Sequence, residues 1–210
     1  YVDVAPDASP TAADVLLGRA SAADAIHDGV IPANLQLAEA EISLAGKMGR
    51  ELVLRKALRE VAGDHDVIMI DCPPALGLLA VNALVAADHA LLSAEAQYFA
   101  LQGVEQALEV LELVRDGLNP DLAWLGVLFN IADMRTVHSR EAYESLKEHV
   151  GTKLLTTTIR SSIAYAESAE RALSILDHRP DLGADYVALA EELLDRLGLR
   201  DARARVAALA

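Results

Sequence analysis

The sequence predicts a doubly wound α/β fold, in which a mostly parallel sheet carries helices on both faces. Short aliphatic runs alternate with longer stretches of helical periodicity from residue 67 onward, as in sheets whose strands are joined by helices. Hydrophobic residues make up 53% of the chain and aromatic residues 4%, so aliphatic side chains fill the core. Residues 67–70, Val-Ile-Met-Ile, are apolar at every position, which favours a strand buried on both faces.

Before residue 67 the sequence predicts three helices and one short strand. The helices cover residues 12–17, 21–26 and 39–61, and the strand covers residues 34–37. Thr11 is a good N-cap for the first helix and Gly18 ends it, while Ser21 is expected to cap the second. The third helix has an apolar stripe formed by Leu44, Met48, Leu52 and Leu58.

From residue 67 onward, strands and helices are expected to alternate. The strands cover residues 67–71, 89–93, 122–129 and 153–158, and the helices cover 76–86, 100–115, 137–150, 165–173 and 181–197. The sequence Gly-Leu-Asn-Pro at 117–120 ends the long helix at 100–115, and Gly151 ends the helix at 137–150. We expect one domain over residues 1–198 and a short carboxyl-terminal tail over 199–210.

The charge is distributed unevenly along the chain. The net charge of −14 argues against a protein that coats DNA over its whole surface. Residues 60–134 contain Arg115 as their one basic residue, against twelve acids, whereas residues 135–210 contain eleven basic and twelve acidic residues. The carboxyl-terminal third can therefore present a local basic patch. A single cysteine, Cys72, excludes an intrachain disulfide framework.

Asp71 is the first candidate for a functional residue. It ends the apolar run at 67–70, and open α/β sheets bind their ligands at the carboxyl ends of strands. A carboxylate there can hold Mg²⁺ through water beside a nucleotide phosphate. Pro73 and Pro74 cannot continue a strand ladder, so the chain must turn sharply after the acid. The alternative is a structural strand end followed by a proline-fixed turn.

Several further motifs follow Asp71 in a characteristic order. They are residues 82–88 (NALVAAD), 95–103 (EAQYFALQG), 117–120 (GLNP), 133–136 (DMRT), 158–160 (TIR) and 183–186 (GADY). In this order and spacing, from about Thr11 to about Leu197, the chain resembles the ParA (Soj-like) branch of the deviant-Walker P-loop ATPases in the MinD/ParA superfamily, which segregate chromosomes and plasmids. The resemblance implies a P-loop NTPase-like fold.

One part of the family pattern has no counterpart in this chain. The resemblance implies an amino-terminal strand and a K-G-G-x-G-K-[ST] loop whose backbone cradles phosphates, but the chain contains no G-x-x-x-x-G-K-[ST]. Residues 1–6 resemble the segment that follows the family's second strand. We therefore expect a chain that lacks the first strand and the P-loop. The carboxylate that positions the attacking water would lie in the same missing segment, so no catalytic residue is identifiable.

Four residues are expected to lie near the nucleotide base. Asn130 ends a strand, and its amide offers both a donor and an acceptor, as an adenine edge requires. The alternative for Asn130 is an amide that caps a turn. The resemblance also places Ile159, Arg160 and Ser161 near the base, with Ile159 where many relatives carry Pro. It further assigns Pro73 to the loop that senses the γ-phosphate in relatives.

Arg135 and Arg160 match arginines with which ParA dimers bind DNA without sequence preference. Guanidinium groups suit phosphates because they stay charged and bind them bidentately. For each, the alternative is a solvated surface arginine. The chain departs from the family pattern at Ala164 and Ala169, which stand where relatives carry Arg and Pro. DNA affinity is therefore expected to be weaker or differently placed.

Taken as a whole, the resemblance implies a partitioning ATPase. It would bind ATP or ADP with Mg²⁺, form a homodimer, bind nucleoid DNA in a bacterial-type cytoplasm, and hydrolyse ATP when a ParB-like partner stimulates it. Two alternatives remain open: a non-hydrolysing ParA-like binding or regulatory protein, and a MinD-like ATPase that positions itself on a membrane surface. The tail has no Phe or Trp, so membrane contact is not expected.

Overall fold

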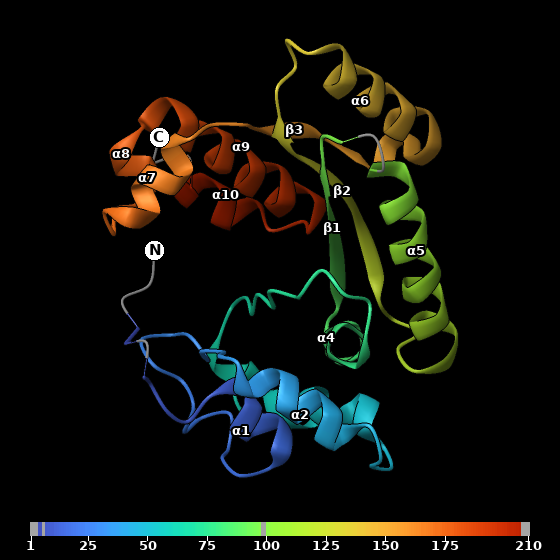
Figure 1. Ribbon diagram of the computed structural model, residues 1–210, viewed down its shortest axis with the longest axis vertical. Helices are drawn as coiled ribbons and strands as arrows, with labels where there is room; N and C mark the ends of the chain where they lie inside the picture. Colours follow the sequence, from blue (N-terminus) through green and yellow to red (C-terminus); the bar gives the residue numbers. More distant parts are fainter. Residues whose placement is uncertain (1–3, 6, 98–99, 207–210) are drawn as a thin grey trace. The chain divides into compact units, whose positions relative to one another are not determined.

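The structure, a computed structural model, describes residues 4–5, 7–97 and 100–206 (Figure 1). The chain divides into two compact units. The sheet unit comprises Ala90–Leu108 and the chain from Ala123 onward, and the helical unit comprises the chain up to His89 together with Glu109–Leu122. In the described residues, no helix combines the length and the apolar character that a membrane span requires.

The sheet unit is built on three parallel strands in the order β1-β2-β3. The strands are β1 (His89–Glu95), β2 (Ala123–Ala132) and β3 (Leu154–Arg160). The helices are α5 (Ala100–Gly117), α6 (Val137–Val150), α7 (Ala164–Glu170), α8 (Ile175–His178), α9 (Pro180–Arg196) and α10 (Arg200–Val206), and a 3-10 turn covers Gly151–Lys153. α5 begins in the sheet unit and continues into the helical unit.

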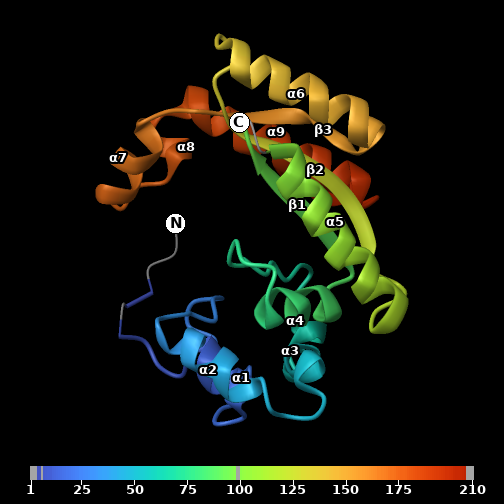
Figure 2. The same ribbon diagram turned by 45° about the vertical axis from the view of Figure 1, so that its right-hand side comes forward.

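Helices cover both faces of this sheet, with α5 and α6 on one face and α9 on the other (Figures 1 and 2). The first layer buries Ala94, Val104, Val127, Phe129, Ala132, Leu146 and Leu154. The second buries Leu128, Leu155 and Ile159, against which Leu189, Leu193 and Tyr165 pack. Leu128 faces the opposite layer from its two neighbours because successive side chains of a strand alternate. The predicted α/β fold is therefore confirmed for this unit.

Strands β2 and β3 pair in an irregular register. Val127 pairs with Leu154, and Phe129 pairs with Thr158, so β3 carries two more residues than β2 between these pairs. The Glu192 side chain of α9 supports this bulge: its carboxylate accepts the backbone N–H groups of Thr156 at 2.9 Å and Thr157 at 2.8 Å. Glu192 thus satisfies backbone donors at an irregular segment of the strand.

The helical unit contains α1 (Ala12–Leu17), α2 (Gln36–Leu44), α3 (Val53–Leu58) and α4 (Leu78–Ala86), with 3-10 turns at Arg50–Leu52 and Ala62–Asp64. Asn82 of α4 is 1% exposed and connects these elements. Its Nδ2 donates to the carbonyl of Arg50 at 2.9 Å, and its Oδ1 accepts from the N–H of Leu54 at 3.2 Å. One buried amide therefore joins α4 to the start of α3.

The predicted helices at 12–17, 76–86, 100–115 and 137–150 are confirmed, with α1 and α6 matching at both ends. Thr11 and Gly18 bound α1 as expected: the Thr11 N–H donates to Asp14 at 3.0 Å, and Gly18 adopts φ +72°. Residues 200–206 of the carboxyl-terminal tail form α10, whose Arg203 pairs with Asp195 of α9.

Three local predictions in the helical unit were wrong. Residues 39–61 do not form one helix, because the chain leaves α2 at Leu44 and Gly49 takes a left-handed φ of +71°, a conformation that glycine adopts at little cost. Residues 34–37 begin α2 instead of forming a strand, since Asn34 Oδ1 accepts the N–H of Gln36. Residues 21–26 form turns and no helix.

The most prominent correction concerns residues 67–70, which do not form a buried strand. Val67 is 55% exposed and Met69 is 87% exposed. A strand needs a neighbour to accept and donate its backbone hydrogen bonds. The described residues of the helical unit offer only the isolated bridge between His27 and Val30. The apolar composition of residues 67–70 therefore favours a strand, but the described residues of the helical unit provide no strand with which it could pair.

Candidate nucleotide-binding site

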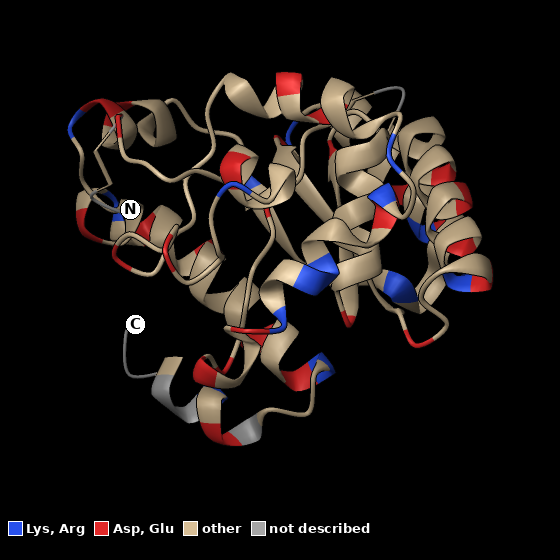
Figure 3. Ribbon diagram, turned by 90° about the horizontal axis from the view of Figure 1, so that it is seen from below, with Lys and Arg blue, Asp and Glu red and all other residues tan. Residues whose placement is uncertain are grey.

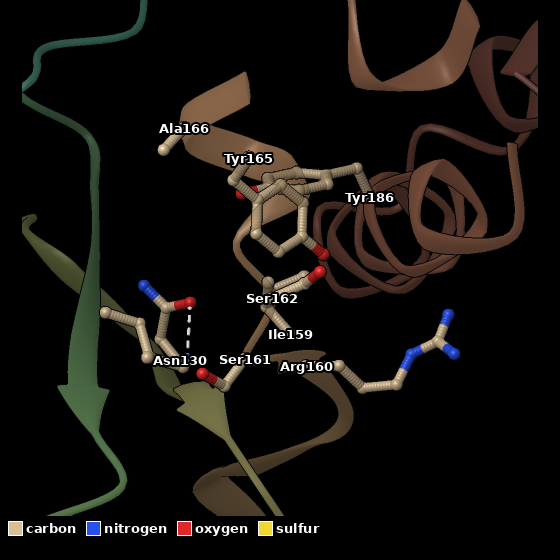
Figure 4. Close-up of a pocket in the computed structure, with 9 residues that line it drawn as sticks. Asn130, Ile159, Arg160, Ser161, Ser162, Tyr165, Ala166 and Tyr186 are labelled. Atoms are coloured by element: carbon tan, nitrogen blue, oxygen red, sulfur yellow. Dashed lines mark hydrogen bonds between the residues drawn. The ribbon is translucent and has the colours of Figure 1, made fainter. Parts of the chain in front are cut away.

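A pocket of about 380 Å³ lies at the carboxyl ends of β2 and β3, within the sheet unit (Figure 4). It is lined by Asn130, Ile131, Ile159, Arg160, Ser161, Ser162, Tyr165, Ala166 and Tyr186. Its volume falls in the range of small-molecule sites, and its position is the edge at which parallel α/β sheets bind ligands. The structure thus brings together Asn130, Ile159 and Ser161, which come from two separate strand ends.

The Asn130 amide is held in place but keeps hydrogen-bonding capacity. Its Oδ1 accepts the N–H of Ile131 at 2.9 Å, and its Nδ2 donates to Ser93 Oγ of β1 at 3.3 Å. An amide has two N–H donors and two acceptor lone pairs, so these two bonds leave one of each. Asn130 is half-buried, and it lines the pocket. Its unused donor and acceptor therefore belong to a pocket side chain.

Ile131, the next residue, has a strained backbone. Its φ is +53°, which is a genuine outlier for a β-branched side chain. The strain coincides with a second register change, since β2 advances three residues between Phe129 and Ala132 while β3 advances two. Bulges and strained residues of this kind occur preferentially beside functional sites. The outlier therefore supports a functional interpretation of this strand end.

The segment after β3 forms the floor of the pocket and leads into α7. Ile159 is 2% exposed and belongs to the core. The Ser161 N–H donates to the carbonyl of Ala132 at 2.9 Å, which extends the pairing of the two strand ends. Ser162 Oγ accepts the N–H of Ala164 at 3.2 Å at the start of α7. These contacts fix the pocket backbone next to the Asn130 amide.

Sequence reasoning missed the two tyrosines of the pocket. The rings of Tyr165 in α7 and Tyr186 in α9 meet edge to face, with centroids 5.8 Å apart and planes inclined by 79°. Figure 4 shows the two rings together on one side of the pocket, with Asn130 and Ser161 on the other. The only available signal was the motif at residues 183–186, which indicated the family and gave no role to its tyrosine.

Arg160 lies in the pocket wall with its guanidinium paired. Its Nε donates to Asp185 Oδ2 at 2.8 Å, its backbone N–H donates to the same carboxylate at 3.2 Å, and its Nη2 donates to the carbonyl of Asp181. The Asp185 carboxylate raises the pKa of Arg160, chiefly through this hydrogen bond. Arg160 therefore fastens the end of β3 to α9.

Arg135 projects from the loop after β2, and its side chain is 91% exposed. Its Nε and Nη2 donate to the two oxygens of Asp133 at 2.8 and 2.9 Å. The Arg135 hydrogen bonds lower the pKa of Asp133 to about 2. Arg140 Nη1 donates to the carbonyls of Met134 and Arg135, at 3.0 and 2.8 Å, and fixes the loop.

Pairing of this kind recurs in the carboxyl-terminal third of the chain. The pairs are Arg135–Asp133, Arg160–Asp185, Arg179–Asp181, Arg196–Glu192 and Arg203–Asp195. Figure 3 accordingly shows basic ribbon segments next to acidic ones. The local basic patch that the composition allowed is therefore neutralised in part by neighbouring carboxylates.

Asp71 and Pro73 belong to the helical unit, where both are exposed in the segment before α4. A lone carboxylate suits Mg²⁺, which keeps several waters and is otherwise held by substrate phosphates. In the part of the chain that the structure describes, no group of three or more His, Cys, Asp or Glu side chains could enclose a metal ion. Asp71 therefore fits a water-mediated magnesium contact and not an all-protein metal cage.

Comparison with known proteins identifies the family. The model of a family described as "AAA domain" matches residues 7–124. The chromosome partitioning protein ParA of Myxococcus xanthus is 36% identical over 180 residues, which are 85% of this chain and 64% of that protein. The chromosome-partitioning ATPase Soj of Thermus thermophilus is 37% identical over 184 residues, 87% of this chain and 71% of that protein. This chain thus spans less than two thirds of the first of these relatives.

Solved structures agree with the fold. Apo McdA from Cyanothece is 24% identical and superposes with a TM-score of 0.78 over 93% of this chain and 80% of that chain. Cobyrinic acid a,c-diamide synthase from Mycobacterium smegmatis, with a bound ATP analog and magnesium, is 35% identical with a TM-score of 0.69 over 81% of this chain and 74% of that chain. The P-loop NTPase-like fold is confirmed, and the chain belongs to the ParA/Soj family of chromosome- and plasmid-partitioning ATPases.

Proposed function

We propose that the protein is a partitioning ATPase and that the pocket at the ends of β2 and β3 receives the adenine of ATP or ADP. The observation that carries this proposal is that Asn130, Ile159 and Ser161 line one pocket. Ile159 is 2% exposed, so it supports the pocket floor from the core side. The spare donor and acceptor of Asn130 match the hydrogen-bonding edge of adenine, and few polar groups in an apolar pocket suffice to orient a ligand.

In this proposal Asp71 holds Mg²⁺ through water, and Pro73 shapes the loop beside it. When bound there, Mg²⁺ would neutralise the charge that develops on the phosphate oxygens during phosphoryl transfer. The part of Asp71 is to orient the hydrated ion with an exposed carboxylate that no hydrogen bond of the described residues engages. We assign no residue of this chain to cradling the phosphates or to positioning the attacking water.

Binding of DNA without sequence preference is assigned to Arg135 and Arg160 of a homodimer, with a ParB-like protein as the partner that stimulates hydrolysis on the nucleoid. Arg135 supports this best because its side chain is 91% exposed. Its pairing with Asp133 leaves Nη1 for a phosphate oxygen. The logarithm of the binding constant should fall by about 0.9 per phosphate neutralised for each tenfold rise in salt.

The test is ATP binding and hydrolysis by the product of the complete open reading frame, measured with and without DNA. Asp71→Ala should abolish turnover, whereas Asp66→Ala, which changes another exposed acid of the same segment, should leave it unchanged. Nucleotide binding without turnover would favour the non-hydrolysing regulatory protein instead. Failure to bind any nucleotide would overturn the proposal, and co-sedimentation with liposomes that depends on residues 197–210 would favour the membrane-positioning alternative.

A further inference from the structure

One wall of the pocket is aromatic and has no role in the binding of adenine described so far. Tyr165 and Tyr186 meet edge to face, an arrangement in which the edge of one ring contacts the face of the other. Tyr186 remains 42% exposed although it packs against Tyr165. The pair therefore leaves aromatic surface uncovered at a pocket that the Asn130 amide also lines.

Tyr186 is held in this wall through its neighbour in sequence. Asp185 accepts hydrogen bonds from both the backbone N–H and the Nε of Arg160, and the Asp185 side chain is 15% exposed. This Arg160–Asp185 clasp ties the end of β3 to the turn of α9 that carries Tyr186. Without it, α9 would lose its charged attachment to the strand end next to the pocket.

Flat heteroaromatic rings are the ligands that such a wall suits. Base–aromatic stacking depends on the π-face that every nucleobase presents, and it contributes a measurable share of affinity for each base. The opposite side of the pocket supplies the amide that a base edge requires. A phosphate chain alone, which has no flat ring, would make no use of two tyrosine rings.

We propose that Tyr165 and Tyr186 form the wall on which a nucleotide base stacks, and that the Arg160–Asp185 clasp positions Tyr186 for this contact. The inference rests on the proposed function of the same pocket and assigns a new role to Arg160. Arg160 acts here as a positioning residue for base binding, in addition to any contact with DNA.

The test compares two ligands of the product of the complete open reading frame: ATP, which has a base, and tripolyphosphate, which has none. Tyr186→Ala should weaken ATP binding about tenfold and leave the affinity for tripolyphosphate unchanged. Tyr186→Phe keeps the ring and should bind ATP within twofold of the wild type. Tyr143→Ala is the matched control, because Tyr143 forms an edge-to-face pair with Phe129 on the other face of the sheet and lies outside the pocket.

The clasp is tested by a double-mutant cycle. Asp185→Ala should weaken ATP binding about threefold or more, without changing tripolyphosphate binding, and should have little further effect in the Tyr186→Ala background, since both changes act on one contact. Equal loss of both ligands in Tyr186→Ala, or undiminished ATP binding, would overturn the inference while leaving the proposed function intact. If the wild type bound neither ligand, both proposals would fall.

Discussion

The Glu192 carboxylate gives the sharpest prediction about stability. Partial burial by itself would raise the pKa of Glu192, but the hydrogen bonds from the backbone N–H groups of Thr156 and Thr157 and from the Thr156 hydroxyl outweigh it. The pKa of Glu192 is lowered from 4.5 to about 2. Its side chain is 14% exposed and also pairs with Arg196 at 2.9 Å, so solvent screens these interactions only in part.

The magnitude follows from the linkage between protonation and folding. Lowering the pKa of Glu192 from 4.5 to about 2 corresponds to at most roughly 3.5 kcal/mol before solvent screening, because a tenfold change in acidity is worth about 1.4 kcal/mol. Because the folded-state pKa is depressed, this stabilisation is fully present above pH 4.5. It is lost as the pH falls toward 2, with roughly half remaining at pH 3. Glu192→Gln should therefore lower the free energy of unfolding by about 2 to 3 kcal/mol at pH 7, and by about half as much at pH 3.

Urea denaturation followed by Trp124 fluorescence measures this effect, because Trp124 is the single tryptophan and lies in β2. The matched control is Glu191→Gln, which makes the same change one residue earlier. Glu191 contacts Arg203 at 3.4 Å, and its loss should cost less than about 1 kcal/mol, as for exposed ion pairs. Equal losses in the two variants, or a Glu192→Gln loss that stays constant from pH 7 to pH 3, would refute this reasoning.

Three further sets of substitutions test the packing inside each of the two units. Tyr165→Phe should stabilise the sheet unit by about 1 kcal/mol in urea, because the Tyr165 hydroxyl is buried without a hydrogen-bond partner in the described residues; a loss of stability would contradict this. Gly126→Ala should lower the stability of the protein strongly, since a Cβ there would collide with the carbonyl oxygen of Lys153. Gly103→Ala in α5, where a Cβ meets nothing within 4 Å, should instead raise the free energy of unfolding by up to about 1 kcal/mol. Similar melting temperatures for the two variants would be inconsistent with this packing. Asn82→Ala should cost about 2 to 4 kcal/mol, because it leaves the partly buried Arg50 carbonyl and Leu54 N–H without their partner; a cost below 1 kcal/mol would show that water replaces the amide.

The sequence predicted the sheet unit well because its elements have local terminators. Gly151 ends α6, and Gly-Leu-Asn-Pro ends α5, and these residues act through their own backbone conformations. The strands β1, β2 and β3 were also found in order, since their aliphatic runs lie between such stops. The observed boundaries of these strands differ from the predicted ones by up to three residues, the largest difference being at the carboxyl end of β2.

The failures have a different physical origin. Residues 67–70 have the apolar composition of a strand, but a strand also needs neighbouring backbones, which no local pattern supplies. In residues 39–61, Gly49 adopts φ +71° and interrupts a helical pattern that its neighbours otherwise continue. Helical periodicity marks the apolar positions but not the point at which a glycine takes a left-handed conformation.

The site was predicted in part for the same reason. Asn130 was found because it follows a recognisable strand, and Ile159 and Ser161 because of the family resemblance. Tyr165 and Tyr186 are 21 positions apart, and Arg160 and Asp185 are 25 apart. Their contacts depend on how α7 and α9 pack on β3, which only the folded structure reveals.

Photolabelling with 8-azido-ATP tests the central claim, that the pocket of the sheet unit binds the base, most directly. In the product of the complete open reading frame, trypsin cleavage after Arg115, Arg135, Arg160, Arg171 and Arg196 yields peptides 116–135, 161–171 and 172–196, since Arg179 precedes a proline. These three peptides contain the pocket residues Asn130, Tyr165 and Tyr186. The account predicts that the label lies on these peptides and that excess ATP removes it. Label confined to other peptides, or label that excess ATP does not displace, would contradict the account.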